Sequence, residues 1–175
     1  HPRITDTAKR LWLIYVLLTF IEFLLLKVAG MNWFDAINHA MATVSTGGFS
    51  TKNNSLSYWN AMPMVQYVII FFMFVAGTNF VLTYFALKGK VKKVLQSEEF
   101  RYYFFGILSM TTLVAFIILF FRDEALQTTI AHPAIYGATE SAIRHALFQV
   151  TSIITTTGFV TADFSITAKE LTITG

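Results

Sequence analysis

Two short stretches of the chain combine glycine with hydroxylated side chains in a way that suits the binding of a cation. They read STGGF at residues 45–49 and TTTGF at residues 155–159. Glycine permits backbone dihedrals that other residues avoid, so successive carbonyl groups can point the same way. Carbonyl and hydroxyl oxygens can replace the water around a cation without adding a fixed charge. Each stretch could therefore bind a positive ion through its oxygen atoms.

The two stretches belong to longer segments that match each other when Gly48 is aligned with Gly158. Four further pairs then coincide: Ala36 with Ala146, Thr46 with Thr156, Phe49 with Phe159, and Thr51 with Thr161. Ser45 falls on Thr155, whereas Gly47 falls on Thr157. Internal repeats of this kind are common in transporters and channels. The sequence therefore predicts two copies of one unit that are equivalent in shape and different in chemistry.

Three apolar segments must position these copies. They cover residues 11–29, 64–87 and 102–121, and each is close to the roughly 20 residues with which a helix crosses a bilayer. Only 13% of the 175 residues are charged, whereas 55% are hydrophobic and 18 are phenylalanine. A soluble domain of this length could hardly bury three such helices on all sides. The composition therefore predicts an all-α integral membrane protein.

The segment before each glycine stretch is too short to span the membrane. Residues 33–46 form a moderately apolar run of about 14 residues, which suits a re-entrant helix. Asp35 lies near its start, where it is expected to cap the helix and complement its dipole. The run then ends in irregular backbone, which at membrane depth is tolerated only where it is buried in protein or lines a cavity. Both loops are therefore expected to line a pore.

The distribution of charge predicts how the helices are oriented. Basic residues gather near the N-terminus and in residues 88–101, which hold five, whereas residues 31–63 hold only Lys52. By the positive-inside tendency, the N-terminus and residues 88–101 are cytoplasmic and Lys52 is external. A nucleic-acid partner is not expected, because the basic segment has no fold of its own and topology accounts for it.

The two glycine-containing segments resemble those of a known family. HAMATVSTGGFST and FQVTSIITTTGFVTADFS are similar to the pore loops of the Trk/Ktr/HKT potassium-transporter superfamily, most closely its bacterial TrkH-like branch. The resemblance implies tandem helix–pore-loop–helix repeats with the pseudo-fourfold architecture of potassium channels. Residues 1–101 would form one complete repeat, resembling the second of four. Residues 102–175 would supply the outer helix and pore loop of the third, in what we expect to be a piece of a longer protein.

The resemblance also implies a function, which is potassium uptake across the inner (plasma) membrane of a bacterium. The potassium ion would be the transported substrate, no cofactor is expected, and the protein would not be an enzyme. Family members form homodimers and bind a cytoplasmic nucleotide-binding ring, so both partners are expected besides the lipid bilayer. Phe49 and Phe159 are expected to pack behind the filter. The expected filter residues are Ser45, Thr46, Gly47, Gly48, Phe49, Thr155, Thr156, Thr157, Gly158 and Phe159.

Four other polar residues are candidates for supporting roles. Glu22 lies within a spanning helix, where a carboxylate is costly; it could touch the ion path, but a polar partner on a neighbouring helix is favoured. A hydrogen bond between helices is favoured over an ion ligand for Asn79. For His39, a bond that supports the filter is favoured over a metal. Asp163 could equally attract cations or cap a helix.

Two other functional classes account less well for the sequence. An intramembrane enzyme would need a nucleophile beside a base, and His39 and Ser45 lie six positions apart, which does not place them on one helical face. Thiol chemistry is excluded because the chain has no cysteine. A scaffold or receptor has no need for two irregular loops at membrane depth. Rescue of cells that lack potassium uptake would separate a transporter from both alternatives.

Overall fold

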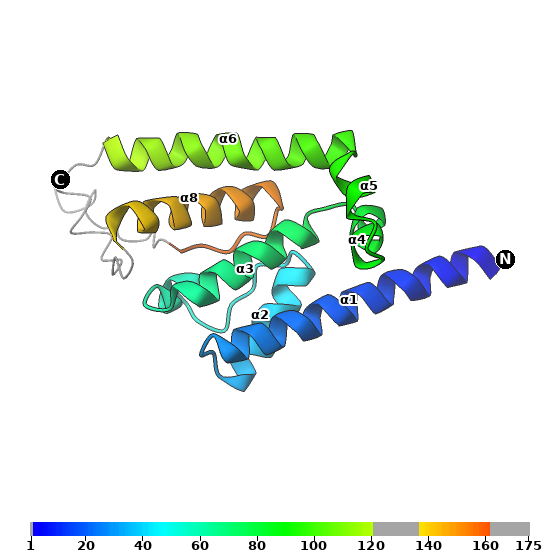
Figure 1. The fold of residues 1–175 in the computed structure, drawn as a ribbon. Helices are drawn as coiled ribbons and strands as arrows, with labels where there is room; N and C mark the ends of the chain where they lie inside the picture. Colours follow the sequence, from blue (N-terminus) through cyan, green and yellow to red (C-terminus); the bar gives the residue numbers. More distant parts are fainter. Residues whose placement is uncertain (1, 121–136, 162–175) are drawn as a thin grey trace, which may run out of the picture.

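The computed structural model describes residues 2–120 and 137–161. All regular elements in these two ranges are helices: α1 (Pro2–Val28), α2 (Trp33–Val44), the 3-10 helix η1 (Ser55–Trp59), α3 (Pro63–Ala76), α4 (Phe80–Leu87), α5 (Val91–Leu95), α6 (Glu98–Phe120) and α8 (Ala138–Ile154). Figure 1 shows α8 between α6 and α3, with α2 against α3 and α1. The expected all-α fold is confirmed.

Two helices are long and apolar enough to cross a membrane, namely Ala8–Val28 within α1 and the whole of α6. Both expose many large apolar side chains along their outer faces, including Phe20 and Phe116. A lipid bilayer can cover such faces, whereas water would leave them unstable. The predicted first and third spanning helices are therefore present.

The second predicted span is not one helix. The apolar stretch from residue 64 to residue 87 is divided into α3 and α4, which meet at an angle of 113°. Gly77 caps the end of α3, and the Asn79 side chain accepts a hydrogen bond from Val81 N at 3.0 Å to begin α4. The expectation of a continuous helix is wrong at this point, because a capping residue at each side of the break replaces the lost helical hydrogen bonds.

The short helix α2 agrees closely with the predicted re-entrant helix. The side chain of Asn32 caps it by accepting a hydrogen bond from Asp35 N at 2.8 Å. Its buried residues include Ala36, Ala40 and Ala42, whose small side chains let it lie close to its neighbours. These features fix where α2 begins and how it packs, so the loop that follows it starts from a rigid element.

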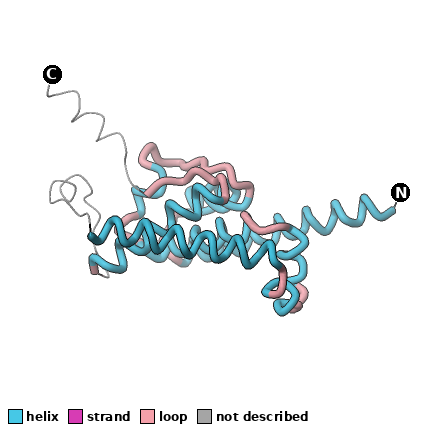
Figure 2. Tube along the Cα trace, turned by 90° about the horizontal axis from the view of Figure 1, so that it is seen from above, coloured by secondary structure: helices cyan, strands magenta, loops and turns pink. Residues whose placement is uncertain are grey.

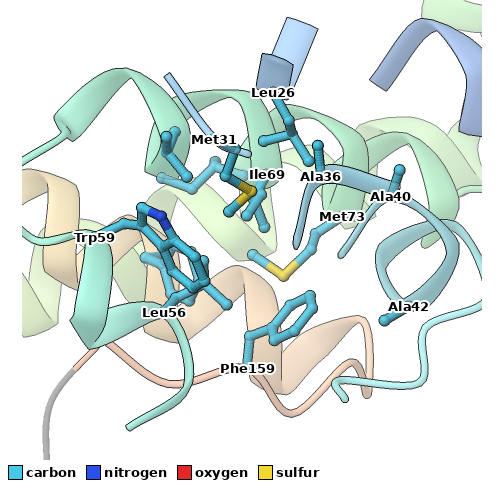
Figure 3. Packing of buried hydrophobic residues seen from close by; sticks show 13 residues of the cluster. Leu26, Met31, Ala36, Ala40, Ala42, Leu56, Trp59, Ile69, Met73 and Phe159 are labelled. Atoms are coloured by element: carbon cyan, nitrogen blue, oxygen red, sulfur yellow. The ribbon is translucent and has the colours of Figure 1, made fainter. Parts of the chain in front are cut away.

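The main apolar core lies where α1, α2, η1, α3 and α8 meet (Figure 3). Trp59 of η1, Met73 of α3 and Phe159 from the loop after α8 all belong to it. Phe159 is fully buried there, so the second loop is anchored in a core that is mostly built by the first half of the chain. The two halves therefore pack as one unit at the level of the loops.

Candidate functional site: two matching loops

The backbone takes the same course after α2 and after α8. Thr46 and Thr156 both adopt the left-handed region, with φ of 51° and 57°, and Gly48 and Gly158 follow with φ of 65° and 85°. Three amide-to-carbonyl hydrogen bonds close each helix end at equivalent positions: 45 to 41, 46 to 43 and 47 to 42 in the first copy, and 155 to 151, 156 to 153 and 157 to 152 in the second. This is a Schellman motif with threonine at the position that glycine usually takes.

The motif leaves the oxygens of each loop available. Within the described parts of the chain, the carbonyl groups of residues 45–48 and 155–158 accept no hydrogen bond. Both loops follow the C-terminal end of a helix, where the helix dipole is partly negative and favours a cation. The arrangement can therefore offer oxygen ligands to a positive ion, as the sequence predicts.

The two loops lie against each other. A β-carbon added to Gly48 would stand 2.0 Å from the carbonyl oxygen of Thr157, far inside any normal contact. Beyond the loops, Leu56 N donates to the carbonyl of Val160 at 3.0 Å. In Figure 2 the longest loop segments run side by side on one side of the helices. Only glycine at position 48 permits this approach.

Hydrogen bonds from side-chain hydroxyl groups stabilise the second loop. Thr155 Oγ1 donates to the carbonyl of Thr151 at 2.8 Å and lies 2.7 Å from Thr157 Oγ1, with both side chains buried. Ser152 Oγ donates to the carbonyl of Phe159 at 2.7 Å. Thr155 and Thr157 thus use their hydroxyls within the protein, so the oxygens that this loop can offer to an ion are its backbone carbonyls and the hydroxyl of the exposed Thr156.

The two phenylalanines are not equivalent. Phe159 is buried and its ring stacks on His39 with centroids 5.8 Å apart. Phe49 is 81% exposed in the described structure. Within the described residues Phe159 thus packs on the core, whereas Phe49 does not, and the expectation that Phe49 packs behind its loop stays a prediction. The physical reason is that the second loop lies on the core of the first half, whereas the first loop turns Phe49 away from that core.

A cluster of polar groups supports the first loop. Asp35, only 3% exposed, accepts hydrogen bonds from Thr51 Oγ1 at 2.5 Å and from Asn32 Nδ2 at 2.7 Å, and Lys52 Nζ lies 3.4 Å from it. Burial opposes ionisation of Asp35, but these hydrogen bonds and the lysine charge outweigh it and lower the pKa of the carboxyl below its usual value. His39 Nε2 lies 2.9 Å from Ser50 Oγ, which is the kind of supporting bond that the sequence analysis favoured.

A longer series of hydrogen bonds supports the second loop. Arg144, which is fully buried, donates to Glu140 at 2.8 Å and to Gln66 Oε1. Gln66 donates to Asn60 Oδ1 at 2.5 Å, and Asn60 donates to the carbonyl of Thr161 at 3.2 Å. The connection therefore runs from α8 through α3 to the end of the second loop.

This series of hydrogen bonds was not predicted from the sequence. A signal for its neighbours was present, since extending the alignment of the two copies pairs Asp35 with His145 and His39 with Gln149. All four are polar residues on helices that are otherwise largely apolar. Arg144 has no polar counterpart in this alignment, because it pairs with Phe34.

The remaining candidates have different outcomes. Glu22 is fully buried, and the polar group of a neighbouring helix that interacts with it is Thr43 of α2, although neither carboxylate oxygen has a well-formed hydrogen bond within the described residues. The hydroxyl of Thr43 interacts with it but donates to the carbonyl of His39. Asn79 caps α4 and reaches Glu99 of α6 at 3.4 Å, so it joins two helices as favoured. Asp163 lies outside the described residues.

Helices of spanning length, together with two short helices that end in matching loops, define the architecture of a pore-loop membrane protein. Comparison with known proteins specifies the class further. The family model for TrkH, described as a cation transport protein, matches residues 1–174. The chain belongs to this family. It is therefore a membrane protein of a transport family, not an enzyme.

Individual relatives agree with this assignment. The chain is 39% identical over 162 residues to the Trk system potassium uptake protein TrkH of Escherichia coli K12, and 32% identical over 165 residues to TrkG of the same organism. It also resembles the crystal structure of the potassium transporter TrkH from Vibrio parahaemolyticus, with a TM-score of 0.77 and 31% identity over 93% of the chain. The chain spans about a third of the length of these relatives, at 31% and 32% of theirs.

Proposed function

We propose that this chain supplies two of the four filter segments of a potassium uptake protein. The observation that carries the proposal is the matching backbone course of the two loops, in which equivalent hydrogen bonds and left-handed residues leave the carbonyls of residues 45–48 and 155–158 without a donor among the described residues. A partly dehydrated potassium ion needs several oxygens of moderate strength, which backbone carbonyls provide. The names of the relatives, potassium uptake proteins and a potassium transporter, support potassium as the ion.

In this proposal each loop contributes one quarter of a ring of oxygens. Residues 1–101 form a complete helix–loop–helix repeat, and residues 102–175 begin the next one. The ring need not be chemically symmetric, because each ion contact is made by a carbonyl, which every residue carries. The difference between Gly47 and Thr157 is then tolerable, since the Thr157 hydroxyl is bound to Thr155.

The proposal extends to location and partners. The transporter lies in the inner membrane of a bacterium, with the N-terminus and residues 88–101 in the cytoplasm. It forms a homodimer and is controlled by a cytoplasmic nucleotide-binding ring. The exposed lysines of residues 88–93 support a cytoplasmic surface that could meet such a partner, because α4 and α5 leave them on the outside of the fold.

Growth and uptake test the proposal. The full-length protein that carries this chain is expressed in a bacterial strain that lacks potassium uptake, and growth in low potassium and uptake of rubidium are measured. Rescue that requires intact loops is the expected result. If the protein is inserted in the membrane and neither growth nor rubidium uptake is restored, the proposed function is wrong.

A further inference from the structure

A threonine after each loop is tied back to the helix that precedes the loop. Thr51 Oγ1 donates to Asp35 Oδ1 at 2.5 Å, and Thr161 Oγ1 lies 3.0 Å from His145 Nδ1. In both copies the two partners are 16 positions apart. Thr51 and Thr161 also follow their loop glycines, Gly48 and Gly158, at the same distance in the sequence. The same connection therefore closes the same hairpin twice.

The chemistry of the two connections is different. Asp35 is an anionic acceptor, and Lys52 and Asn32 complete its contacts. In the second copy a histidine takes this place, and Gln149 Nε2 donates to Thr161 Oγ1 at 3.3 Å. The hydrogen bond between Thr161 Oγ1 and His145 Nδ1 joins two neutral groups when the imidazole is uncharged, and the histidine tautomer decides which of them donates.

The position of each connection relates it to the ion site. Each one joins the helix before a loop to the segment that leaves the loop, with Asp35 in the first turn of α2 and His145 near the middle of α8. The free carbonyls lie between the two joined positions in the chain. The hydrogen bond therefore limits how far the outgoing segment can move from the helix. A closed hairpin holds the carbonyls at a fixed spacing, whereas an open one would let them adjust to a smaller ion.

We propose that Asp35 with Thr51, and His145 with Thr161, are two equivalent clamps that fix the carbonyl spacing of the loops and thereby set the preference for potassium over sodium. The four residues are positioning residues, because none of them needs to touch the ion. The inference rests on the proposed function. It goes beyond that function by assigning part of the selectivity to side chains outside the loops.

The test removes and restores the hydroxyl at each clamp in the full-length protein. Thr51→Val and Thr161→Val keep the shape of the side chain and lose the hydrogen bond, whereas Thr51→Ser and Thr161→Ser keep the hydroxyl. Thr112→Val is the matched control, because its hydroxyl bonds only to the carbonyl of Leu108 within α6. Rubidium uptake is measured with competing sodium or potassium, together with the amount of inserted protein.

We expect Thr51→Val to lower the preference for potassium by about tenfold and Thr161→Val by about threefold, since a hydrogen bond to a charged group is worth more than one between neutral groups. Both serine variants should restore the preference, and Thr112→Val should leave it unchanged. Adding Asp35→Asn to Thr51→Val should change the preference little further, because the connection is already lost.

The outcomes separate the clamp from the proposed function. If the wild-type protein takes up no rubidium, the proposed function fails and the clamp fails with it. If the wild-type protein is selective and both valine variants keep that selectivity, the clamp proposal is wrong while the proposed function stands. A valine variant that only lowers the amount of inserted protein, with selectivity unchanged, also contradicts the clamp, because it shows a role in stability alone.

Discussion

Replacing Gly48 by serine should disturb the loops more than any comparable change. A side chain in the left-handed region costs about 1–2 kcal/mol. The added β-carbon would also stand 2.0 Å from the carbonyl oxygen of Thr157, whereas real contacts of this kind are essentially never under 3.0 Å. The two loops must therefore move apart by about 1 Å at this point. That displacement acts directly on a carbonyl of the second loop.

Gly158→Ser provides a measure of the dihedral strain alone. Gly158 has φ of 85°, but nothing lies within 4 Å of the added β-carbon. If the strain of about 1–2 kcal/mol were relieved entirely by rotating a carbonyl, potassium preference would fall by about 5- to 30-fold. Gly48→Ser carries the same strain and the displacement as well, so its loss should be larger. Sodium should be less affected, since it can stay partly hydrated.

Rubidium uptake against competing sodium or potassium measures both effects in the full-length protein. Gly89→Ser is the control, because Gly89 also has positive φ, at 72°, with open space around it, and lies in the segment between α4 and α5. Its selectivity should match the wild-type protein. The reasoning is refuted if Gly158→Ser reduces selectivity more than Gly48→Ser does, or if neither variant changes it while the protein is inserted normally.

Three further predictions concern topology and support. In a cysteine-free full-length protein, a cysteine at Lys52 should react with an impermeant reagent from outside and one at Lys92 only from inside; labelling of position 92 from outside would reverse the topology. Gln66→Leu should destabilise the purified protein by about 1.5–3 kcal/mol, because Arg144 loses an acceptor, and Gln66→Glu should lower the melting temperature less. Folding lowers the pKa of Asp35 below its ordinary 3.8, so its carboxylate stabilises the protein above that value and this contribution is lost as the pH falls through the folded pKa. In melting temperatures measured against pH, the advantage over Asp35→Asn should persist to below pH 4; an advantage lost above pH 5 would contradict the shift.

The sequence was sufficient to predict the elements that depend on local pattern. Residues 33–46 were expected to form a short helix, and α2 covers Trp33–Val44. Its capping residue, its small buried residues and the glycines after it are all close together in the chain, so the signal is local. The equivalence of the two loops followed from aligning Gly48 with Gly158, and the backbone dihedrals agree with it.

The sequence was not sufficient to predict contacts between residues far apart in the chain. It was also not sufficient to predict the bend between α3 and α4, where the apolar pattern is interrupted only briefly. Thr78 and Asn79 interrupt the apolar stretch only briefly, and no proline marks the bend between α3 and α4, so hydropathy alone favours one helix. The contact between Arg144 and Gln66 joins residues 78 positions apart. A single sequence does not indicate that these two residues are in contact. Neither of them belongs to a hydrophobic period or to a repeated motif from which the contact could be predicted.

The buried arginine of α8 affects how the protein can be assembled during synthesis. Arg144 is enclosed by groups on α8 and α3, and an arginine at the centre of an isolated helix costs about 2.5–3.5 kcal/mol to insert into a bilayer. Translation completes α3 well before α8, so Gln66 has already been synthesised when α8 emerges. The second short helix would then enter the membrane by docking on a folded partner, and not by its own hydrophobicity. Assembly at the loops therefore follows the order in which the chain is made.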